Sequence, residues 1–259
     1  MKKKLIFLYG ILAYFAFSFV FLYAIGFFNN LIVPKSIDTG ASSPFWQALW
    51  IDAGLICLFA IQHSVMARPG FKRVWTRIVP KAIERSTYVL LASLVFALLY
   101  WQWRPLPERI WDIEAAWGQL LMWGLYGLGW AVVIVSTFMI SHTHLFGLKQ
   151  VYDHLRGQKL SSPAFKTTGF YHYIRQPMNL GLLIAFWATP HMTVGHLVFS
   201  VAATGYILVA LRLEERDLIQ VFGDKYRNYQ KKVPMLIPRI RPVGPSLADF
   251  EKEKRRTAH

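Results

Sequence analysis

The sequence contains little charge and a single cysteine. Charged residues make up 17% of the 259 residues, and 14 acidic residues stand against 29 lysines and arginines, so the net charge is +15. A soluble domain carries about 25% charged residues. Because Cys57 is the only cysteine, a disulfide-stapled secreted domain is excluded. The composition also argues against a basic nucleic-acid-binding domain and against a disordered chain, and no internal repeat of solenoid length occurs.

The sequence is rich in apolar residues, at 54%, and in aromatic residues, at 16%. Residues 5–28 and 117–140 are uncharged runs of 24 residues each. As a helix, about 20 apolar residues span the hydrocarbon core of a bilayer. The sequence therefore predicts an all-α, multi-pass transmembrane helical bundle. Because the first run is longer than the apolar core of a signal peptide, we interpret it as a retained helix.

Further spans are predicted at 44–67 and 86–103. Residues 180–211 are also uncharged, but Pro190 interrupts them. This stretch is too long for one untilted helix and barely long enough for two. We therefore expect four spans followed by a helical hairpin, whose first arm is short and whose turn lies at 189–193.

The basic residues are distributed unequally between the loops. If the N-terminus lies in the cytoplasm, 26 of the 29 lysines and arginines fall on the cytoplasmic side, and Lys35, Arg104 and Arg109 fall on the other. This asymmetry is the positive-inside pattern of multi-pass membrane proteins. It predicts that both termini are cytoplasmic and that the basic surface contacts anionic lipids, as in a bacterial inner membrane.

Most chemically capable residues lie in the second half of the chain. We expect residues 1–140 to form transmembrane scaffold helices, residues 141–241 to form the functional region, and residues 242–259 to form a charged, disordered tail. Asp52 and His63 are polar residues inside the second predicted span. Asp52 is expected to face the bundle, because a carboxylate exposed to lipid is costly, but the sequence does not assign it a role.

Two histidines, His142 and His144, follow the fourth span. A zinc site needs three or four converging ligands, and no recognisable spacing unites these two with His154 or His172. We therefore predict no metal site. A haem or metal site that uses His142, His144 and His63 is kept as an alternative.

The segment Arg175-Gln176-Pro177 precedes the hairpin. Pro177 is expected to begin a helix, because proline is favoured at the first helical position. An arginine beside a helix N-terminus can bind a carboxylate, since its donors act together with the helix dipole. The alternative is that Arg175 is an ordinary basic residue at the membrane surface. Gly181 would allow close approach of a ligand or of another backbone.

Glu214 and Glu215 are adjacent where the second arm of the hairpin leaves the membrane. Two neighbouring carboxylates are costly to bury, so on such a helix they are often solvated and paired with arginines. The pair alone therefore does not identify a site. The alternation of apolar and charged residues over 219–233 predicts an interfacial helix.

Three features occur together: the pattern Gly-x-Tyr-x-x-x-Arg-x-Pro-x-x-x-Gly ending at Gly181, the hydrophobic hairpin, and Arg-x-Glu-Glu followed by Phe222-Gly223-x-x-Tyr226-x-x-Tyr229. In this combination the sequence resembles the membrane methyltransferase superfamily that includes isoprenylcysteine carboxyl methyltransferase and bacterial phospholipid N-methyltransferases. The resemblance covers about residues 140–240. It implies a cofactor pocket for S-adenosylmethionine (SAM) that opens to the cytoplasm, flanked by the Arg-x-Pro element and the Glu-Glu pair.

Within that superfamily the sequence looks most similar to the nurim-like branch, and there to the bacterial methanethiol S-methyltransferases. The segments that carry this similarity are 142–150, 185–196 and 204–218. The sequence departs from the superfamily pattern at three positions. Gln176 and Asn179 stand where histidine and tyrosine are usual, and His144 stands where an acidic residue is expected. Glutamine can hydrogen bond but cannot titrate, so an acid–base role at position 176 is in doubt.

The resemblance implies methylation of a small thiol, with methanethiol as substrate and dimethyl sulfide as product. We expect the site to combine cofactor contacts, thiol activation and an apolar wall. The cofactor residues predicted are Gln150, Tyr171, Arg175, Gln176, Pro177, Gly181 and Glu215. The catalytic residues predicted are Arg212, Glu214 and His142, with Arg212 as the cation that favours the thiolate. The substrate contacts predicted are Phe186, Trp187 and Met192.

Two other functions remain open from the sequence. One is a SAM-dependent methyltransferase of a lipid or prenylated thiol or carboxylate, which would need a longer groove between the spans. The other is a non-enzymatic, nurim-like membrane protein. Membrane lipid is expected around the chain in every case, whereas no nucleic acid and no obligate protein partner are expected. The sequence does not indicate an oligomeric state.

Overall fold

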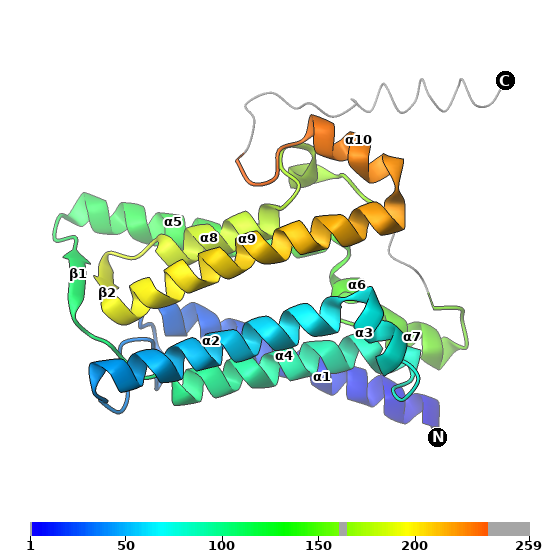
Figure 1. The fold of residues 1–259 in the computed structure, drawn as a ribbon, viewed down its shortest axis with the longest axis horizontal. Coiled ribbons are helices and arrows are strands. Elements are labelled where there is room, and N and C mark those ends of the chain that lie inside the picture. Colours follow the sequence, from blue (N-terminus) through cyan, green and yellow to red (C-terminus); the bar gives the residue numbers. More distant parts are fainter. Residues whose placement is uncertain (1, 161–164, 238–259) are drawn as a thin grey trace.

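The computed structural model describes residues 2–160 and 165–237, and it is a bundle of helices (Figure 1). Within these residues, five helices are long and apolar enough to cross a membrane: α1 (Lys2–Phe28), α2 (Phe45–Ala67), α4 (Lys81–Gln102), α5 (Ala116–Ile140) and α9 (Val194–Phe222). A shorter apolar helix, α8 (Pro177–Trp187), precedes α9. The predicted polytopic helical bundle is confirmed. The charged tail expected at 242–259 lies outside the described residues.

The predicted hairpin has a short first arm, as expected. Pro177 occupies the first turn of α8, and the helix ends after 11 residues at Trp187. The turn contains a strand, β2 (His191–Thr193), which pairs antiparallel with β1 (Arg109–Asp112) from the loop between α4 and α5. The side chain of Thr193 then accepts a hydrogen bond from the amide of His196, which caps the start of α9.

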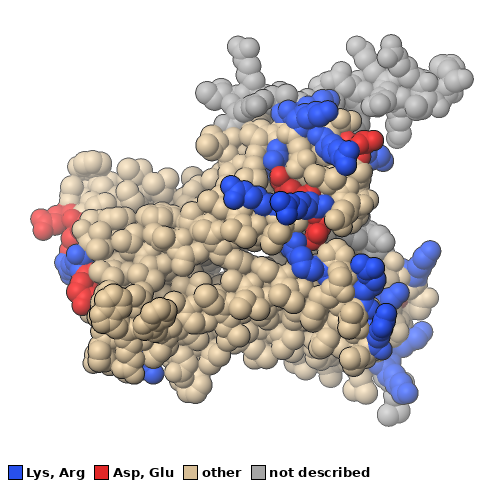
Figure 2. Space-filling view, in the orientation of Figure 1, with Lys and Arg blue, Asp and Glu red and all other residues tan. Residues whose placement is uncertain are grey.

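Short helices gather at the other end of the bundle. They are α3 (Pro69–Trp75), α6 (His142–Leu145), α7 (Leu148–Arg156), the 3-10 helix η1 (Gly169–His172) and α10 (Asp224–Lys232). Figure 2 shows that lysines and arginines concentrate at this end, which we call the basic end. The end that carries β1 and β2 is the opposite end.

One interfacial helix was expected over 219–233, and this prediction is wrong. Helix α9 continues to Phe222, the chain turns at Gly223, and α10 begins at Asp224. Gly223 has a φ of 57°, a backbone conformation that favours glycine. The turn folds α10 back towards the start of α8.

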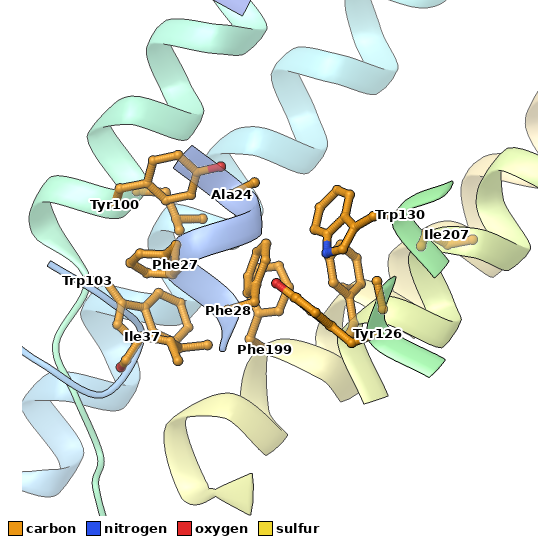
Figure 3. Close-up of a cluster of buried hydrophobic side chains, with 14 of the residues drawn as sticks. Ala24, Phe27, Phe28, Ile37, Tyr100, Trp103, Tyr126, Trp130, Phe199 and Ile207 are labelled. Carbon is orange, nitrogen blue, oxygen red and sulfur yellow. The ribbon is translucent and has the colours of Figure 1, made fainter. Parts of the chain in front are cut away.

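The five spanning helices and α8 form two layers, which Figure 1 shows one above the other: α1, α2 and α4 in one, and α5, α8 and α9 in the other. Aromatic side chains join the layers towards the opposite end (Figure 3). Phe28 of α1 lies 4.5 Å from Phe199 of α9 and 4.9 Å from Phe186 of α8, measured between ring centroids. All three side chains are buried. At the basic end, Arg68 after α2 forms an ion pair with Asp217 of α9 at 2.8 Å.

Helices α5 and α8 approach each other at a pair of glycines. A Cβ atom added to Gly181 would lie 2.6 Å from the carbonyl oxygen of Gly129, and one added to Gly129 would lie 2.7 Å from the carbonyl oxygen of Gly181. Such distances are too short for a side chain. Gly181 therefore permits the approach of another backbone, which was one of the two uses expected for it.

The glycine contact predicts the effect of Gly181→Ala. The added methyl group must push α8 away from α5, and overpacking of this kind costs about 1–3 kcal/mol. We expect a lower midpoint of thermal unfolding in detergent, measured by circular dichroism. Gly124→Ala on α5 is the control, because a Cβ atom there meets nothing within 4 Å. An equal effect of both substitutions would contradict a specific contact.

Candidate active site

A cavity of about 560 Å³ lies between the two helical layers. Its wall is formed by α1, α2, α4, α5, α8 and α9 together with α6, and most of it is aromatic or aliphatic. Phe28, Phe186 and Phe199 line it near the opposite end. The polar residues in the wall are Tyr14, Ser18, His63, Arg85, Tyr88, Ser93, Tyr100, Thr137, His142, Asn179 and Tyr206. Small-molecule sites have volumes of about 300–1,000 Å³ and a few polar groups in an apolar wall, so this central cavity is a candidate site.

An ion pair at the basic end connects α8, α9 and α10. The Nε of Arg175 lies 2.6 Å from Oε1 of Glu215, and the two side chains are only 10% and 12% exposed. Arg175 also donates through Nη1 to the carbonyls of Gln230 and Val233. Glu215 accepts from the hydroxyl of Tyr226 at 3.3 Å and from Nε2 of Gln230 at 2.9 Å. We call these five residues the Arg175–Glu215 cluster.

Backbone hydrogen bonds place this cluster beside the first turn of α8. The amides of Arg175 and Gln176 donate to the carbonyls of Pro234 and Met235 at 2.9 and 3.1 Å. The Gln176 side chain accepts a hydrogen bond from Nδ2 of Asn179 at 3.0 Å. Because Asn179 lines the central cavity, the first turn of α8 links the cluster to the cavity wall.

Tyrosines surround the cluster as hydrogen-bond donors. The Tyr229 hydroxyl donates to the carbonyl of Tyr171 at 2.6 Å, which ties α10 to η1. Burial raises the pKa of Tyr171, Tyr226 and Tyr229 well above the usual value, and the charge of Glu215 adds to this at Tyr226 and Tyr229. These phenols therefore remain protonated at neutral pH and act as donors.

Glu214 precedes Glu215 on α9, and its charge acts on Tyr226 of the Arg175–Glu215 cluster as well as on phenols outside the cluster. Its charge acts on the phenols of Tyr88, Tyr171 and Tyr206, which come from three different elements. The residue is exposed to solvent, and the charges of Arg68 and Arg85 act on its carboxylate. The adjacent glutamates thus have different surroundings: Glu215 is bound by protein groups, whereas Glu214 faces the space between the layers at the basic end.

His142 has a partner on each ring nitrogen. Thr137 donates its hydroxyl proton to the carbonyl of Ile134 at 2.7 Å, so it accepts from Nδ1–H of His142, 2.9 Å away. The Nε2 atom then accepts from the hydroxyl of Tyr14 at 2.8 Å. Burial lowers the pKa of His142, which favours this neutral imidazole. Tyr14, Thr137 and His142 all line the central cavity.

The other residues expected at the site lie in different places. Phe186 lines the central cavity, whereas Trp187 donates to Thr204 and is partly exposed, and Met192 is buried in β2 at the opposite end. Arg212 is exposed on α9. Of the predicted site residues, all of which the structure describes, only His142 and Phe186 line the cavity wall. The predicted cofactor residues and Glu214 lie outside it, as do Trp187, Met192 and Arg212.

Gln150 lies on α7, across from the Arg175–Glu215 cluster. Its Nε2 donates to the carbonyl of His144 at 3.1 Å, while its buried Oε1 has no hydrogen-bond partner among the described residues. A buried oxygen without a partner is costly, so it is well suited to accept a hydrogen bond from a ligand. Within residues 2–160 and 165–237, no three histidine, cysteine or acidic side chains are grouped so that they could hold a metal ion.

Several wall residues were missed by the sequence analysis. Tyr14, Arg85 and Tyr88 lie in the region assigned to scaffold, yet they line the cavity. His63 was noticed as a polar residue within a span, and it hydrogen bonds to Tyr88 at 2.8 Å. Polar side chains inside apolar spans face protein interiors or cavities, and this signal also applied to Tyr14.

Comparison with known proteins finds relatives that cover most of the chain. It is 52% identical to a methanethiol S-methyltransferase of Mycobacterium tuberculosis, over 92% of this chain and 98% of the relative. It is 48% identical to a methanethiol S-methyltransferase of Crocosphaera subtropica, over 93% of this chain and 94% of the relative. Human nurim is 30% identical over 64% of this chain and 66% of nurim. No family model matches the chain, and no solved structure matches it significantly.

The burial of the Arg175–Glu215 ion pair predicts strong coupling between its two members. Glu215→Ala would leave Arg175 without its counter-charge, and breaking a buried pair costs about 3–5 kcal/mol. We expect a lower thermal midpoint in detergent, and a double Arg175→Ala, Glu215→Ala variant that loses less than the sum of the single variants. Asp224→Ala, which breaks an exposed pair with Arg227, is the control. Additive losses would contradict the coupling.

The lowered pKa of His142 predicts a pH dependence of stability. The unfolded histidine binds a proton near its ordinary value of 6.5, whereas the folded one binds it only at lower pH. The folded state therefore loses stability as the pH falls below 6.5 towards the folded pKa. Between about pH 7.5 and about pH 5, the thermal midpoint should fall further in the wild type than in His142→Gln. Equal decreases would contradict this assignment.

Proposed function

This chain belongs to the methanethiol S-methyltransferase family, and from that premise we propose that it methylates methanethiol with SAM to give dimethyl sulfide. The central cavity supports this proposal. Methanethiol is small and apolar, so it partitions into lipid and into an apolar pocket within the membrane. A charged cofactor needs polar groups. Some of these, such as His142 and Asn179, line the cavity, and others lie outside its wall in the Arg175–Glu215 cluster, to which the first turn of α8 connects it.

The residues at the basic end fit the polar groups of SAM. The carboxylate of its methionine part needs donors, which Arg175 and the N-terminus of α8 beginning at Pro177 supply. Its amine needs an acceptor. Because Glu215 already forms an ion pair with Arg175, we assign the amine of SAM to Glu214. Glu215 then keeps the Arg175 side chain in position. The carboxylate-binding role remains with Arg175.

The nucleoside part of SAM needs further hydrogen-bonding groups. The Oε1 of Gln150 lacks a partner among the described residues and can accept a hydrogen bond. Gln176 and the protonated phenol of Tyr171 are the other polar side chains that we assign to it. Gly181 contributes by bringing α8 against α5, which sets the position of this first turn.

SAM, when bound, supplies a methyl group attached to a sulfonium sulfur. The carbon of this methyl group accepts an electron pair from a thiolate. The chain's own residues hold the thiol in an apolar space and keep water out. Phe186 forms part of that wall. Because only the thiolate is a strong nucleophile, the protein must also remove the proton from the thiol.

We assign proton removal to Tyr14 and His142. Tyr14 and His142 both line the cavity, and the Tyr14 hydroxyl lies 2.8 Å from Nε2 of the neutral imidazole. Tyr14 can take a proton from the thiol while it passes its own to Nε2 of His142. The bond from Nδ1 of His142 to Thr137 holds the ring in the tautomer that this transfer requires.

We also propose an orientation for the chain. The basic end faces the cytoplasm of a bacterial inner membrane, because positively charged ends of spans are retained on that side. SAM then enters from the cytoplasm, and the thiol enters from the lipid or from the same side.

Two measurements test the proposed function. Titration calorimetry of S-adenosylhomocysteine into detergent-purified protein should show binding, and headspace gas chromatography should detect dimethyl sulfide from methanethiol and SAM. Glu214→Gln removes the negative charge that attracts the cofactor amine, and losing a charge-assisted hydrogen bond of about 1.5–3 kcal/mol weakens binding roughly 10- to 100-fold. Glu114→Gln, an exposed carboxylate at the opposite end, should bind normally. Folded wild-type protein that binds no S-adenosylhomocysteine and makes no dimethyl sulfide would overturn the proposal.

A further inference from the structure

The wall of the central cavity contains an arginine that the assignments above do not use. Of the described residues that line the cavity, only Arg85 carries a charge at neutral pH. It lies in the first turns of α4 and is partly buried. Charged side chains are costly in apolar surroundings at membrane depth, and they are retained there for a partner or a function.

Arg85 is held in place from two directions. Its Nε donates to the carbonyl of Leu145 at 2.7 Å, and its guanidinium lies over the ring of Tyr88, 4.8 Å from the centroid. Leu145 is the last residue of α6, the helix that begins with His142. Arg85 is therefore anchored to the same short helix that carries the proposed proton acceptor.

Other charged and titratable groups surround Arg85. From α9, the charge of Glu214 faces it, and from α2 and α3 the nearest groups are His63, Arg68 and Lys72. Tyr88 on its own helix hydrogen bonds to His63. Glu84 and Asp217 are also nearby, but they form ion pairs with Lys72 and Arg68. Glu214 is the acidic group whose charge acts on Arg85. If the amine of SAM binds Glu214, as proposed above, the positive charge of Arg85 is left for a second anion.

We propose that this second anion is the acceptor thiolate, and that Arg85 is the catalytic cation that binds its sulfur. This inference rests on the proposed function and names the residue that activates the substrate. It replaces the role that the sequence suggested for Arg212, which is exposed and does not line the cavity.

The strength of the effect follows from the apolar wall. Coulomb attraction grows as the dielectric constant falls, and water is largely excluded from an aromatic cavity. An opposite charge within about 4–6 Å shifts a pKa by about 1–3 units towards the charged form. Arg85 therefore raises the fraction of thiol that is ionised at neutral pH.

The step balances without a redox partner. The thiol sulfur gives its proton to Tyr14 and His142 and keeps the electron pair. That pair forms the new sulfur–carbon bond, while the bond from the methyl carbon to the sulfonium sulfur breaks and leaves its electrons on that sulfur. The product thioether is neutral, so Arg85 no longer attracts it, and it returns to the lipid.

Two thiols that differ mainly in acidity distinguish this role from a structural one. Ethanethiol and 2,2,2-trifluoroethanethiol share a carbon skeleton, but the fluorinated thiol is much more acidic and is largely ionised without help. In Arg85→Gln, we expect methylation of ethanethiol to fall roughly 10- to 1,000-fold, the range of a shift of about 1–3 pKa units. Methylation of the fluorinated thiol should fall far less. Arg85→Lys, which keeps the positive charge, should retain most of the ethanethiol methylation.

A second readout needs no cofactor. The ultraviolet difference absorbance of thiolate, measured as ethanethiol binds, should titrate at higher pH in Arg85→Gln than in the wild type. Lys81→Gln is the matched control, because Lys81 is an exposed cation one turn earlier on α4. It should leave both readouts unchanged.

Equal losses with both thiols, together with an unshifted thiolate titration, would overturn the inference and assign Arg85 to holding α6. Unchanged methylation of ethanethiol in Arg85→Gln would also overturn the inference. These outcomes are separate from failure of the proposed function, in which the wild type itself binds no S-adenosylhomocysteine and methylates neither thiol.

Discussion

The ion pair between Arg175 and Glu215 is the interaction on which the basic end depends. It joins the segment before α8 to the last turns of α9, and the bonds from Arg175 to Gln230 and Val233 also fix the chain around the end of α10. A buried ion pair is favourable only when hydrogen bonds satisfy its remaining atoms. Tyr226 and Gln230 provide these bonds to Glu215. Three helices thus share one electrostatic centre, beside a cavity whose wall is almost entirely apolar.

The sequence predicts the transmembrane architecture well, because a long apolar run has essentially one stable solution in a bilayer. It also predicts the short first arm of the hairpin, since Pro177 and Pro190 limit that helix from both sides. The strands β1 and β2 could not be foreseen, because four and three residues are too few to show a period. The break at Gly223 was missed for a related reason: the alternation of apolar and charged residues continues across it.

The site was predicted less completely. Arg175 and Glu215 are 40 residues apart, so only the resemblance to a family, and not their spacing, could suggest that they lie close together. Arg85 was assigned to the basic loop before the span predicted at 86–103, whereas α4 begins at Lys81. Tyr14 was assigned to the scaffold because a single polar residue in a span does not reveal which neighbour its helix face meets. That direction is set by the packing of α1 against α4, and by the contact of α6 with Arg85. Physical reasoning about one helix at a time cannot supply it.

The aromatic contact between Phe28, Phe186 and Phe199 has a consequence for the whole cell. A water-filled space that passed through the bundle would let protons leak down the electrochemical gradient that energises the membrane. These buried rings pack 4.5 to 5.1 Å apart and line the cavity near the opposite end, so in the described part of the chain aromatic packing opposes a water path through that end. The protein can therefore open a reaction chamber within the bilayer while the membrane keeps its ability to store energy.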